Sequence, residues 1–205
     1  MAIAALLVFA MFALVAGGAR VLIQRRRTGD TGIRQFRPTP GSVQWWAHWG
    51  FVTGGLITGL AGPLADLAGL APIPLADRVA VTVTGVVVAV AGVAATFAAQ
   101  LAMGTSWRIG VDDTEHTHLV TTGVFAYMRN PIFTAMLVTF AGLALMVPNP
   151  VAVAGYALLL TGVQAQVRAV EEPYLHQVHG SSYTDYTARV GRFLPSVGRK
   201  RPIRQ

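Results

Sequence analysis

Two segments of this chain carry the polar and aromatic side chains with which a protein could do chemistry. The first runs from His116 to Phe133 and reads His-Thr-His-Leu-Val-Thr-Thr-Gly-Val-Phe-Ala-Tyr-Met-Arg-Asn-Pro-Ile-Phe. The second is the adjacent pair Glu171 and Glu172, which follows two apolar stretches farther along the chain. Ionisable groups at membrane depth are costly and are usually retained for function. We therefore predict that these two segments form the functional site and that the remaining chain positions them.

The two histidines of the first segment, His116 and His118, are weak evidence for a metal centre. A zinc site takes three or four protein ligands, and two histidines alone do not complete such a set. The chain has no cysteine, which excludes thiolate metal sites, disulfides and cysteine nucleophiles. We predict no metal ion at this site.

Composition places both segments in a membrane protein. Of the 205 residues, 53% are hydrophobic and 12% are charged, and the mean hydropathy is +0.52. Soluble domains average about 25% charged residues. The net charge of +7 could indicate nucleic acid, but the basic residues lie beside the ends of apolar runs. That distribution is typical of membrane proteins facing anionic lipids, so we expect membrane lipids and not nucleic acid as partners.

Five apolar stretches approach the roughly 20 residues that cross a bilayer, namely residues 2–23, 43–60, 78–103, 131–147 and 151–167. They predict an all-α, polytopic membrane protein with about five transmembrane helices. The first stretch is interpreted as a retained helix and not as a cleaved signal peptide, because its arginines follow it. The second contains the small-xxx-small spacings Gly50/Gly54 and Gly55/Gly59, which favour close helix packing.

The remaining segments are predicted to connect these helices or to follow them. Residues 24–44 and 62–77 are interpreted as loops, and the last two helices form a tight hairpin that either spans the membrane or re-enters it. The tail predicts a short cytoplasmic helical segment that begins near Pro173 and breaks at His179-Gly180. We expect a single membrane domain, 1–205, with a three-helix scaffold (1–103), a cofactor- and substrate-binding half (104–195) and a basic tail (196–205).

Basic residues also predict which face of the membrane carries the site. Arg25 to Arg27, Arg108, Arg129 and the basic tail all border apolar stretches. Because Lys and Arg are enriched on the cytoplasmic side, residues 24–44, 104–130 and 171–205 are expected to share that side.

The two polar segments resemble one known family. His118-Leu119-Val120-Thr121-Thr122-Gly123 and Tyr127-x-Arg129-Asn130-Pro131-x-Phe133 are similar to the H-x-L-V-T-x-G and R-H-P-x-Y signature of the isoprenylcysteine carboxyl methyltransferases. Glu171-Glu172, Gly180-x-x-Tyr183-x-x-Tyr186 and Arg192-Phe193-Leu194-Pro195 resemble the tail of that family. The resemblance covers Trp107 to Pro195. The chain departs from the family at Phe125, Asn130 and Phe133, and these changes leave the methyl acceptor open.

The resemblance implies a multi-helix membrane fold that binds S-adenosyl-L-methionine at the cytoplasmic face. Carried over residue by residue, it implies cofactor contacts from His118, Leu119, Val120, Gly123, Asn130, Pro131, Glu171, Glu172 and Tyr183. It implies catalytic roles for Arg129, Tyr127 and Arg192. Methyl transfer from a sulfonium needs no covalent enzyme intermediate, so the protein mainly positions both reactants and excludes water.

Helical spacing suggests how the charged side chains divide these tasks. Gln164, Arg168 and Glu171 share one face of an ideal helix, so Glu171 is expected to point inward. Glu172 would then pair with Arg168 or cap the next helix, where acidic groups are favoured. Arg129 either lines the pocket and holds a carboxylate, or extends to lipid headgroups.

Two other functions remain open from the sequence. Membrane sterol and steroid reductases that bind NADPH share a similar tail, but this chain lacks their R-H-x-N-Y-x-G-D pattern after the arginine and has no G-x-G-x-x-G unit after a strand. A non-enzymatic lipid-binding protein would leave the polar segments unexplained. The sequence therefore favours a methyltransferase whose lipophilic acceptor enters from the bilayer. It does not predict the oligomeric state.

Overall fold

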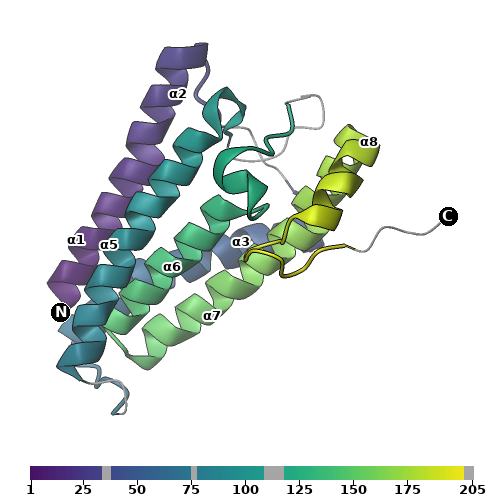
Figure 1. Cartoon of the computed structure of the whole chain (residues 1–205). Coiled ribbons are helices and arrows are strands. Elements are labelled where there is room, and N and C mark those ends of the chain that lie inside the picture. Colours follow the sequence, from purple (N-terminus) through teal and green to yellow (C-terminus); the bar gives the residue numbers. More distant parts are fainter. Residues whose placement is uncertain (34–37, 75–77, 109–117, 201–205) are drawn as a thin grey trace.

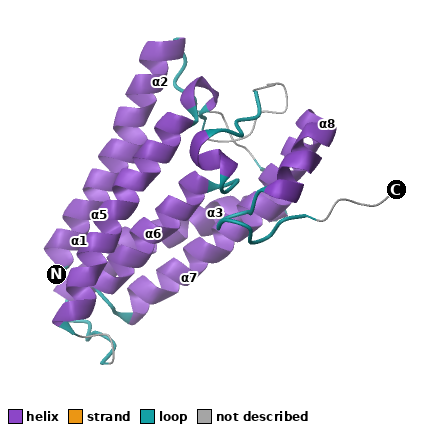
Figure 2. Cartoon of the chain, viewed as in Figure 1, coloured by secondary structure: helices purple, strands orange, loops and turns teal. Residues whose placement is uncertain are grey.

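The computed structural model describes residues 1–33, 38–74, 78–108 and 118–200, and these residues form helices and loops (Figures 1 and 2). The N-terminal helix comprises α1 (Ala2–Phe12), the π-helical η1 (Ala13–Ala19) and α2 (Arg20–Thr28). The next comprises α3 (Val43–Leu56), the π-helical η2 (Ile57–Ala61) and α4 (Gly62–Leu67). They are followed by α5 (Val79–Ala102), α6 (Pro131–Met146), α7 (Pro150–Ala165), the π-helical η5 (Gln166–Glu171) and α8 (Glu172–Arg189). Short 3₁₀ turns, η3 (Gly104–Ser106) and η4 (Gly123–Ala126), lie between α5 and α6.

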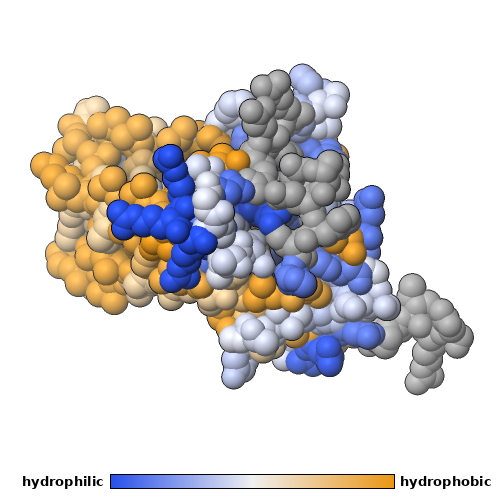
Figure 3. All heavy atoms as spheres, turned by 90° about the horizontal axis from the view of Figure 1, so that it is seen from above, coloured by the Kyte–Doolittle hydropathy of each residue, from blue (hydrophilic) through white to orange (hydrophobic). Residues whose placement is uncertain are grey.

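Within the described residues, four helices are long and apolar enough to cross a membrane: Ala2–Thr28, Val43–Leu67, Val79–Ala102 and the apolar part of Pro150–Arg189. The apolar helix Pro131–Met146 is shorter. Viewed from above in Figure 3, hydrophobic residues cover the part of the molecule around α1 and α5, and hydrophilic residues lie over the end of α2 and toward α8. The predicted all-α, multi-pass membrane fold is confirmed.

Two predicted helix ends were too early. The first helix continues past residue 23, so Arg25, Arg26 and Arg27 form its last turn and not the start of a loop. Cations are favoured at a helix C-terminus, and the first residue able to end this helix is Gly29. The second helix continues beyond residue 60 to Leu67, although it contains Pro63. The turn before Pro63 is π-helical, a local rearrangement that helices use to absorb an irregularity.

Close contacts between backbones hold the bundle together, as the glycine spacing predicts. A Cβ atom at Gly54 in α3 would overlap the backbone of Leu159 in α7, and one at Gly162 would overlap the backbone of Phe51. The neighbouring Gly55 faces Phe140 of α6. Small residues let helices approach closely enough for van der Waals packing, which drives helix association where water is absent.

The hairpin between α6 and α7 has the predicted form, with ends within two residues of those expected. Its turn is fixed by Asn149, which is fully buried. The side-chain oxygen of Asn149 accepts a hydrogen bond from the Ala152 N–H at 2.9 Å, and its amide donates to the Gly62 carbonyl at 2.8 Å. This turn is therefore bound to the end of the second helix.

The tail differs from the prediction in where its helix starts. Instead of restarting near Pro173, the helix runs on from α7 through η5 into α8, with Pro173 in the first turn of α8. The predicted break is present at Gly180, whose φ of 52° and ψ of −124° are not helical. In Figure 1 the end of α2, the end of α5 and α8 lie toward one end of the bundle, and the N-terminus and the α6–α7 turn lie toward the other.

Candidate functional site

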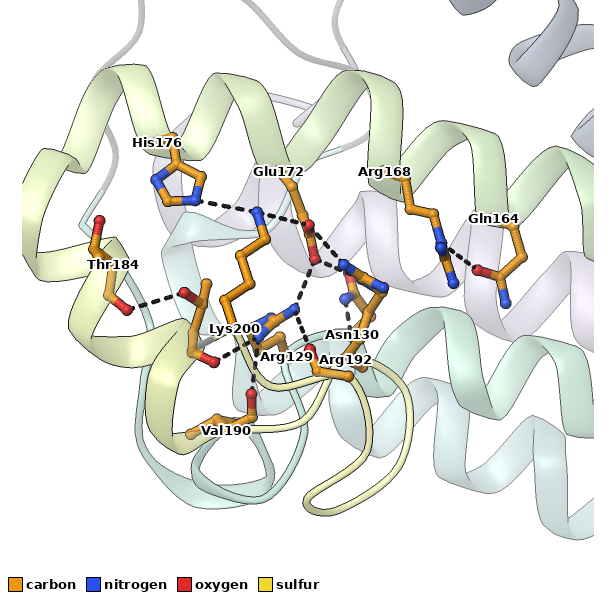
Figure 4. Close-up of polar contacts among 12 residues, drawn as sticks. Arg129, Asn130, Gln164, Arg168, Glu172, His176, Thr184, Val190, Arg192 and Lys200 are labelled. Carbon is orange, nitrogen blue, oxygen red and sulfur yellow. Dashed lines mark hydrogen bonds and ion pairs between the residues drawn. The ribbon is translucent and has the colours of Figure 1, made fainter. Parts of the chain in front are cut away.

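The buried carboxylate of Glu172 lies at the centre of the polar end of the bundle (Figure 4). Arg129 Nη2 lies 2.7 Å from its Oε1 atom. Arg192 binds it with both nitrogens of its fork, Nε to Oε1 at 2.7 Å and Nη2 to Oε2 at 3.0 Å. Lys200 Nζ lies 3.2 Å from Oε2. One anion thus faces three cations, an excess of positive charge that would also attract an anionic group of a ligand.

Arg129 links this carboxylate to the end of α8. Its Nη1 atom donates to the carbonyls of Thr187 at 3.1 Å and Val190 at 2.9 Å, and Nη2 also donates to the Gly198 carbonyl at 3.3 Å. The last carbonyls of a helix have no partner within the helix, so a buried guanidinium satisfies them and counters the negative end of the dipole. The buried Arg129 therefore holds the end of α8 in place and does not extend to lipid headgroups.

The backbone beside Arg129 is paired with the tail that carries Arg192. The Arg129 N–H donates to the Gly191 carbonyl at 2.9 Å, and the Asn130 N–H donates to the Arg192 carbonyl at 3.0 Å. The Asn130 side-chain amide donates to the same Arg192 carbonyl at 3.1 Å. The hydrogen bond to Glu172 raises the pKa of Arg192, which keeps this guanidinium charged. The segment before α6 and the tail are about 60 residues apart in the sequence, and they lie paired beside Glu172.

Aromatic side chains of α8 form the wall next to the carboxylate. Tyr183 and Tyr186 are buried and pack with Leu119, Leu175 and Val190. The Tyr186 hydroxyl donates to the Phe125 carbonyl at 2.6 Å, which attaches η4 to α8. The ring of His176 meets that of Tyr183 edge-on, with centroids 4.7 Å apart. The segment that contains Leu119 is therefore docked against the helix that carries Glu172.

The other predicted site residues lie around this cluster with varied exposure. His118 is exposed and Val120 is half-buried. Gly123 begins η4 with a φ of 60°, as expected for a turn that needs glycine. Pro131 is buried in the first turn of α6, whereas Tyr127 is 68% exposed. The predicted residue His116 lies outside the described residues.

The predicted roles of the two glutamates are reversed. Glu171 is half-buried, and Glu172 is the one that points into the cluster. The cause is the π-helical turn η5, which contains about one more residue than an α-helical turn. The extra residue shifts the chain by one position, so Glu172 lies on the inward face that an unbroken α-helix would have given to Glu171. The predicted Arg168–Glu172 pair is also wrong, because Arg168 Nε donates to Gln164 Oε1 at 3.0 Å.

Lys200 is the member of the cluster that the sequence motifs did not predict. It lies five residues beyond the last matched residue, Pro195, in a stretch interpreted as a solvated basic tail. One signal was available: the 16 basic residues of the chain include a single lysine, and it is Lys200.

An apolar groove of about 290 Å³ lies between α5, α6 and α7, next to the tail segment. Val88, Leu137, Tyr156 and Phe193 line its apolar walls, and Thr134 and Gln164 add polar atoms. Thr134 Oγ1 donates to the Phe193 carbonyl at 2.9 Å, and this hydrogen bond connects α6 to the segment that follows Arg192. In the part of the chain that is described, no group of three or more His, Cys, Asp or Glu residues could hold a metal.

Known membrane methyltransferases are similar to this chain in sequence. The sequence model of the phospholipid methyltransferase family matches residues 80–182. Protein-S-isoprenylcysteine O-methyltransferase B of Arabidopsis thaliana is 35% identical over 83 residues, which cover 40% of this chain and 42% of the relative. The human protein-S-isoprenylcysteine O-methyltransferase is 30% identical over 118 residues, 57% of this chain and 42% of the relative. The chain thus spans less than half the length of these curated relatives.

A solved structure is also similar in fold. It is that of a eukaryotic intramembrane Ras methyltransferase, isoprenylcysteine carboxyl methyltransferase. The TM-score is 0.58 at 18% identity, over 95% of this chain and 68% of that chain. The resemblance to the isoprenylcysteine carboxyl methyltransferases is confirmed, and with half of its residues matched by the family model the chain belongs to the phospholipid methyltransferase family.

Proposed function

We propose that this protein is an integral membrane methyltransferase that transfers the methyl group of S-adenosyl-L-methionine to a lipophilic acceptor. The observation that carries this proposal is the convergence of the two family-like segments on one carboxylate. Arg129 comes from the segment before α6 and Arg192 from the tail, and both bind Glu172. Membership of the family supports methyl transfer over the NADPH-dependent reductase and over a non-enzymatic lipid-binding protein.

The residues around Glu172 fit the polar groups of the cofactor. A carboxylate suits its ammonium, an aromatic wall such as Tyr183 suits its positive charge, and the backbone of the turn at 118–123 suits its adenine edge. Arg129 Nε is buried without a hydrogen-bond partner among the described residues, so the cluster keeps one unsatisfied donor. The cofactor supplies an electrophilic methyl group, and the chain binds it, orients it and excludes water.

The hydrogen bonds of Arg129 and Arg192 indicate what these two residues do in the proposed site. Both hold the Glu172 carboxylate in place, and Arg129 also holds the end of α8, so both act as positioning residues in this proposal. The proposed cofactor contacts from the turn and from the start of α6 are His118, Leu119, Val120, Gly123, Asn130 and Pro131. A catalytic role for the exposed Tyr127 stays a prediction.

The groove between α5, α6 and α7 supports a lipophilic acceptor. Its rim includes Val138, Leu160 and Leu194, which are 41%, 36% and 54% exposed, so an apolar chain can reach it from the lipid side. The cytoplasmic side is proposed for the site, because the end of α2 with its arginines lies at the same end of the bundle as α8. The acceptor group can be a prenylated thiol carboxylate, an amine or another lipid headgroup.

Transfer of a radiolabelled methyl group tests the proposal. The purified protein in lipid nanodiscs is incubated with labelled S-adenosyl-L-methionine and, in separate arms, a prenylcysteine, a vesicle containing an aminophospholipid, and a total membrane lipid extract. We expect label in at least one lipophilic product and none in free cysteine. No transfer in any arm, from protein that is folded and binds NADPH saturably, would return the function to the reductase.

A further inference from the structure

Lys200 holds a distinct position among the three cations on Glu172. Its Nζ atom lies 3.2 Å from Glu172 Oε2 and 3.3 Å from His176 Nε2 (Figure 4). Its side chain is 41% exposed, whereas those of Arg129 and Arg192 are 1% and 15% exposed. The carboxylate itself is 4% exposed. The side of Glu172 that borders solvent is therefore covered by the lysine ammonium.

The other partners of the carboxylate are two arginines that the protein holds firmly. Its Oε1 atom accepts from Arg129 and Arg192, which are held by α8 carbonyls and by the paired backbone. Its Oε2 atom accepts from Arg192 and faces Lys200. Lys200 is the most exposed of the three cations on the carboxylate, so it is the one that a ligand arriving from solvent meets first.

The tail that carries Lys200 is held by hydrogen bonds, including those from the Arg192 N–H to the Val197 carbonyl at 2.7 Å and from the Val197 N–H to the Leu194 carbonyl at 3.2 Å. The Lys200 N–H donates to the Thr187 carbonyl at 3.0 Å, and the Gly198 carbonyl accepts from Arg129 at 3.3 Å. Residues 194–199, which connect Arg192 and Phe193 to Lys200, are exposed. An exposed segment buries little surface, so it can be displaced at a smaller cost in free energy than the buried core.

The chemistry of the side chain indicates what displaces it. Lysine ends in a primary ammonium on a flexible stem, a point charge that leaves a carboxylate more easily than the planar fork of arginine. The α-ammonium of S-adenosyl-L-methionine is the same chemical group. We propose that Lys200 occupies, in the ligand-free protein, the position on Glu172 that the cofactor's ammonium takes, so that the tail competes with the cofactor. This inference rests on the proposed function.

Calorimetric titration with S-adenosylhomocysteine tests the competition. A half-exposed ion pair is a weak competitor, so Lys200→Gln should tighten binding about two- to five-fold. Arg199→Gln is the matched control, because Arg199 is exposed and donates to Ser196 Oγ, away from the carboxylate. It should bind as the parent does. 5′-Methylthioadenosine lacks the amino-acid portion, and its affinity should not change in Lys200→Gln.

A second measurement needs no variant. Lys200 is the only lysine, so an amine-reactive reagent can label this side chain and the N-terminus alone. Saturating S-adenosylhomocysteine should increase acylation of Lys200 relative to the N-terminus, and 5′-methylthioadenosine should not. Parent-like or weaker binding by Lys200→Gln, or protection of Lys200 by the ligand, would overturn the inference and leave the proposed function intact. Absence of binding by the parent would overturn both.

Discussion

At the scale of single residues, the site depends on the balance of charge around Glu172. Three cations and one carboxylate lie in a largely buried cluster, so the carboxylate is what makes the burial of Arg129 tolerable. Removing one partner of a buried ion pair leaves the other charge uncompensated, which destabilises more than the pair itself contributes. Glu172 therefore has a structural task in addition to the proposed cofactor contact.

Glu172→Gln should destabilise the protein far more than Glu171→Gln. The first change leaves Arg129 buried without an anion, at a cost of roughly 3–5 kcal/mol. The second alters a half-buried side chain that is not the ion-pair partner of Arg129, Arg192 or Lys200, and it should cost less than about 1 kcal/mol. Thermal unfolding of both purified variants measures the difference. Equal losses, or a larger loss in Glu171→Gln, would contradict the assignment of Glu172 as the central carboxylate.

Arg129→Lys should impair the protein although the charge is kept. Lysine has one side-chain nitrogen and cannot reach the carbonyls of Thr187 and Val190 together with Glu172. At least one hydrogen bond from a charged donor is then lost, which should lower the free energy of unfolding by about 1.5–3 kcal/mol. Arg189→Lys is the control and should be close to neutral, because the side chain of Arg189 in the last turn of α8 is exposed. Unfolding temperature and affinity for S-adenosylhomocysteine are measured for both. Parent-like values in Arg129→Lys would mean that the four hydrogen bonds of the Arg129 guanidinium contribute little to stability or to binding.

The sequence predicted the composition of this cluster better than its arrangement. Arg129, Arg192, Glu172 and Tyr183 were all candidates, and they do lie together. The choice between Glu171 and Glu172 was wrong because it assumed an unbroken α-helix, and no residue type marks a π-helical turn. Lys200 was missed because its contact depends on how a loop of the tail folds back.

At the scale of elements, the helices that bear the site are positioned by contacts at their ends and along their glycines. Arg20 is one such contact. Its buried guanidinium donates to the carbonyls of Gln100 and Gly104 at the end of α5, at 3.3 and 2.7 Å, and lies 4.3 Å from the ring of Trp107. The sequence placed Arg20 inside an apolar stretch and gave it no role, because its partners are backbone atoms 80 residues away.

Gly54→Ala should separate α3 from α7. The added methyl group would overlap the backbone of Leu159, which cannot move as a flexible side chain would, so we expect a loss of about 1–3 kcal/mol. Gly17→Ala is the control, since a Cβ atom there has no neighbour within 4 Å. It should be neutral or stabilising by up to about 1 kcal/mol, because alanine is the better helix former. Chemical unfolding in detergent compares them, and similar losses would argue against close packing at Gly54.

At the scale of the whole molecule, the predicted apolar stretches all became helices. The errors lie at ends where the sequence has no strong breaker, as at residue 23, or where a π-helical turn accommodates a proline, as at Pro63. The division of the chain into scaffold, binding half and tail stays a prediction. So does the cytoplasmic side of the polar end.

Introduced cysteines test that orientation, because the chain has none of its own. Ser196→Cys lies at the polar end, and Leu70→Cys lies beyond α4 in the connection to α5. Both positions are exposed. A membrane-impermeant thiol reagent should label Leu70→Cys in intact cells and Ser196→Cys only after permeabilisation. The opposite pattern would place the site outside the cytoplasm.

The central claim is that the convergence around Glu172 forms a site for S-adenosyl-L-methionine. Calorimetric titration of the purified protein with S-adenosylhomocysteine and, in parallel, with NADPH tests it most directly. We expect saturable binding of S-adenosylhomocysteine and no saturable binding of NADPH. Saturable binding of NADPH by folded protein, with none of S-adenosylhomocysteine, would contradict it.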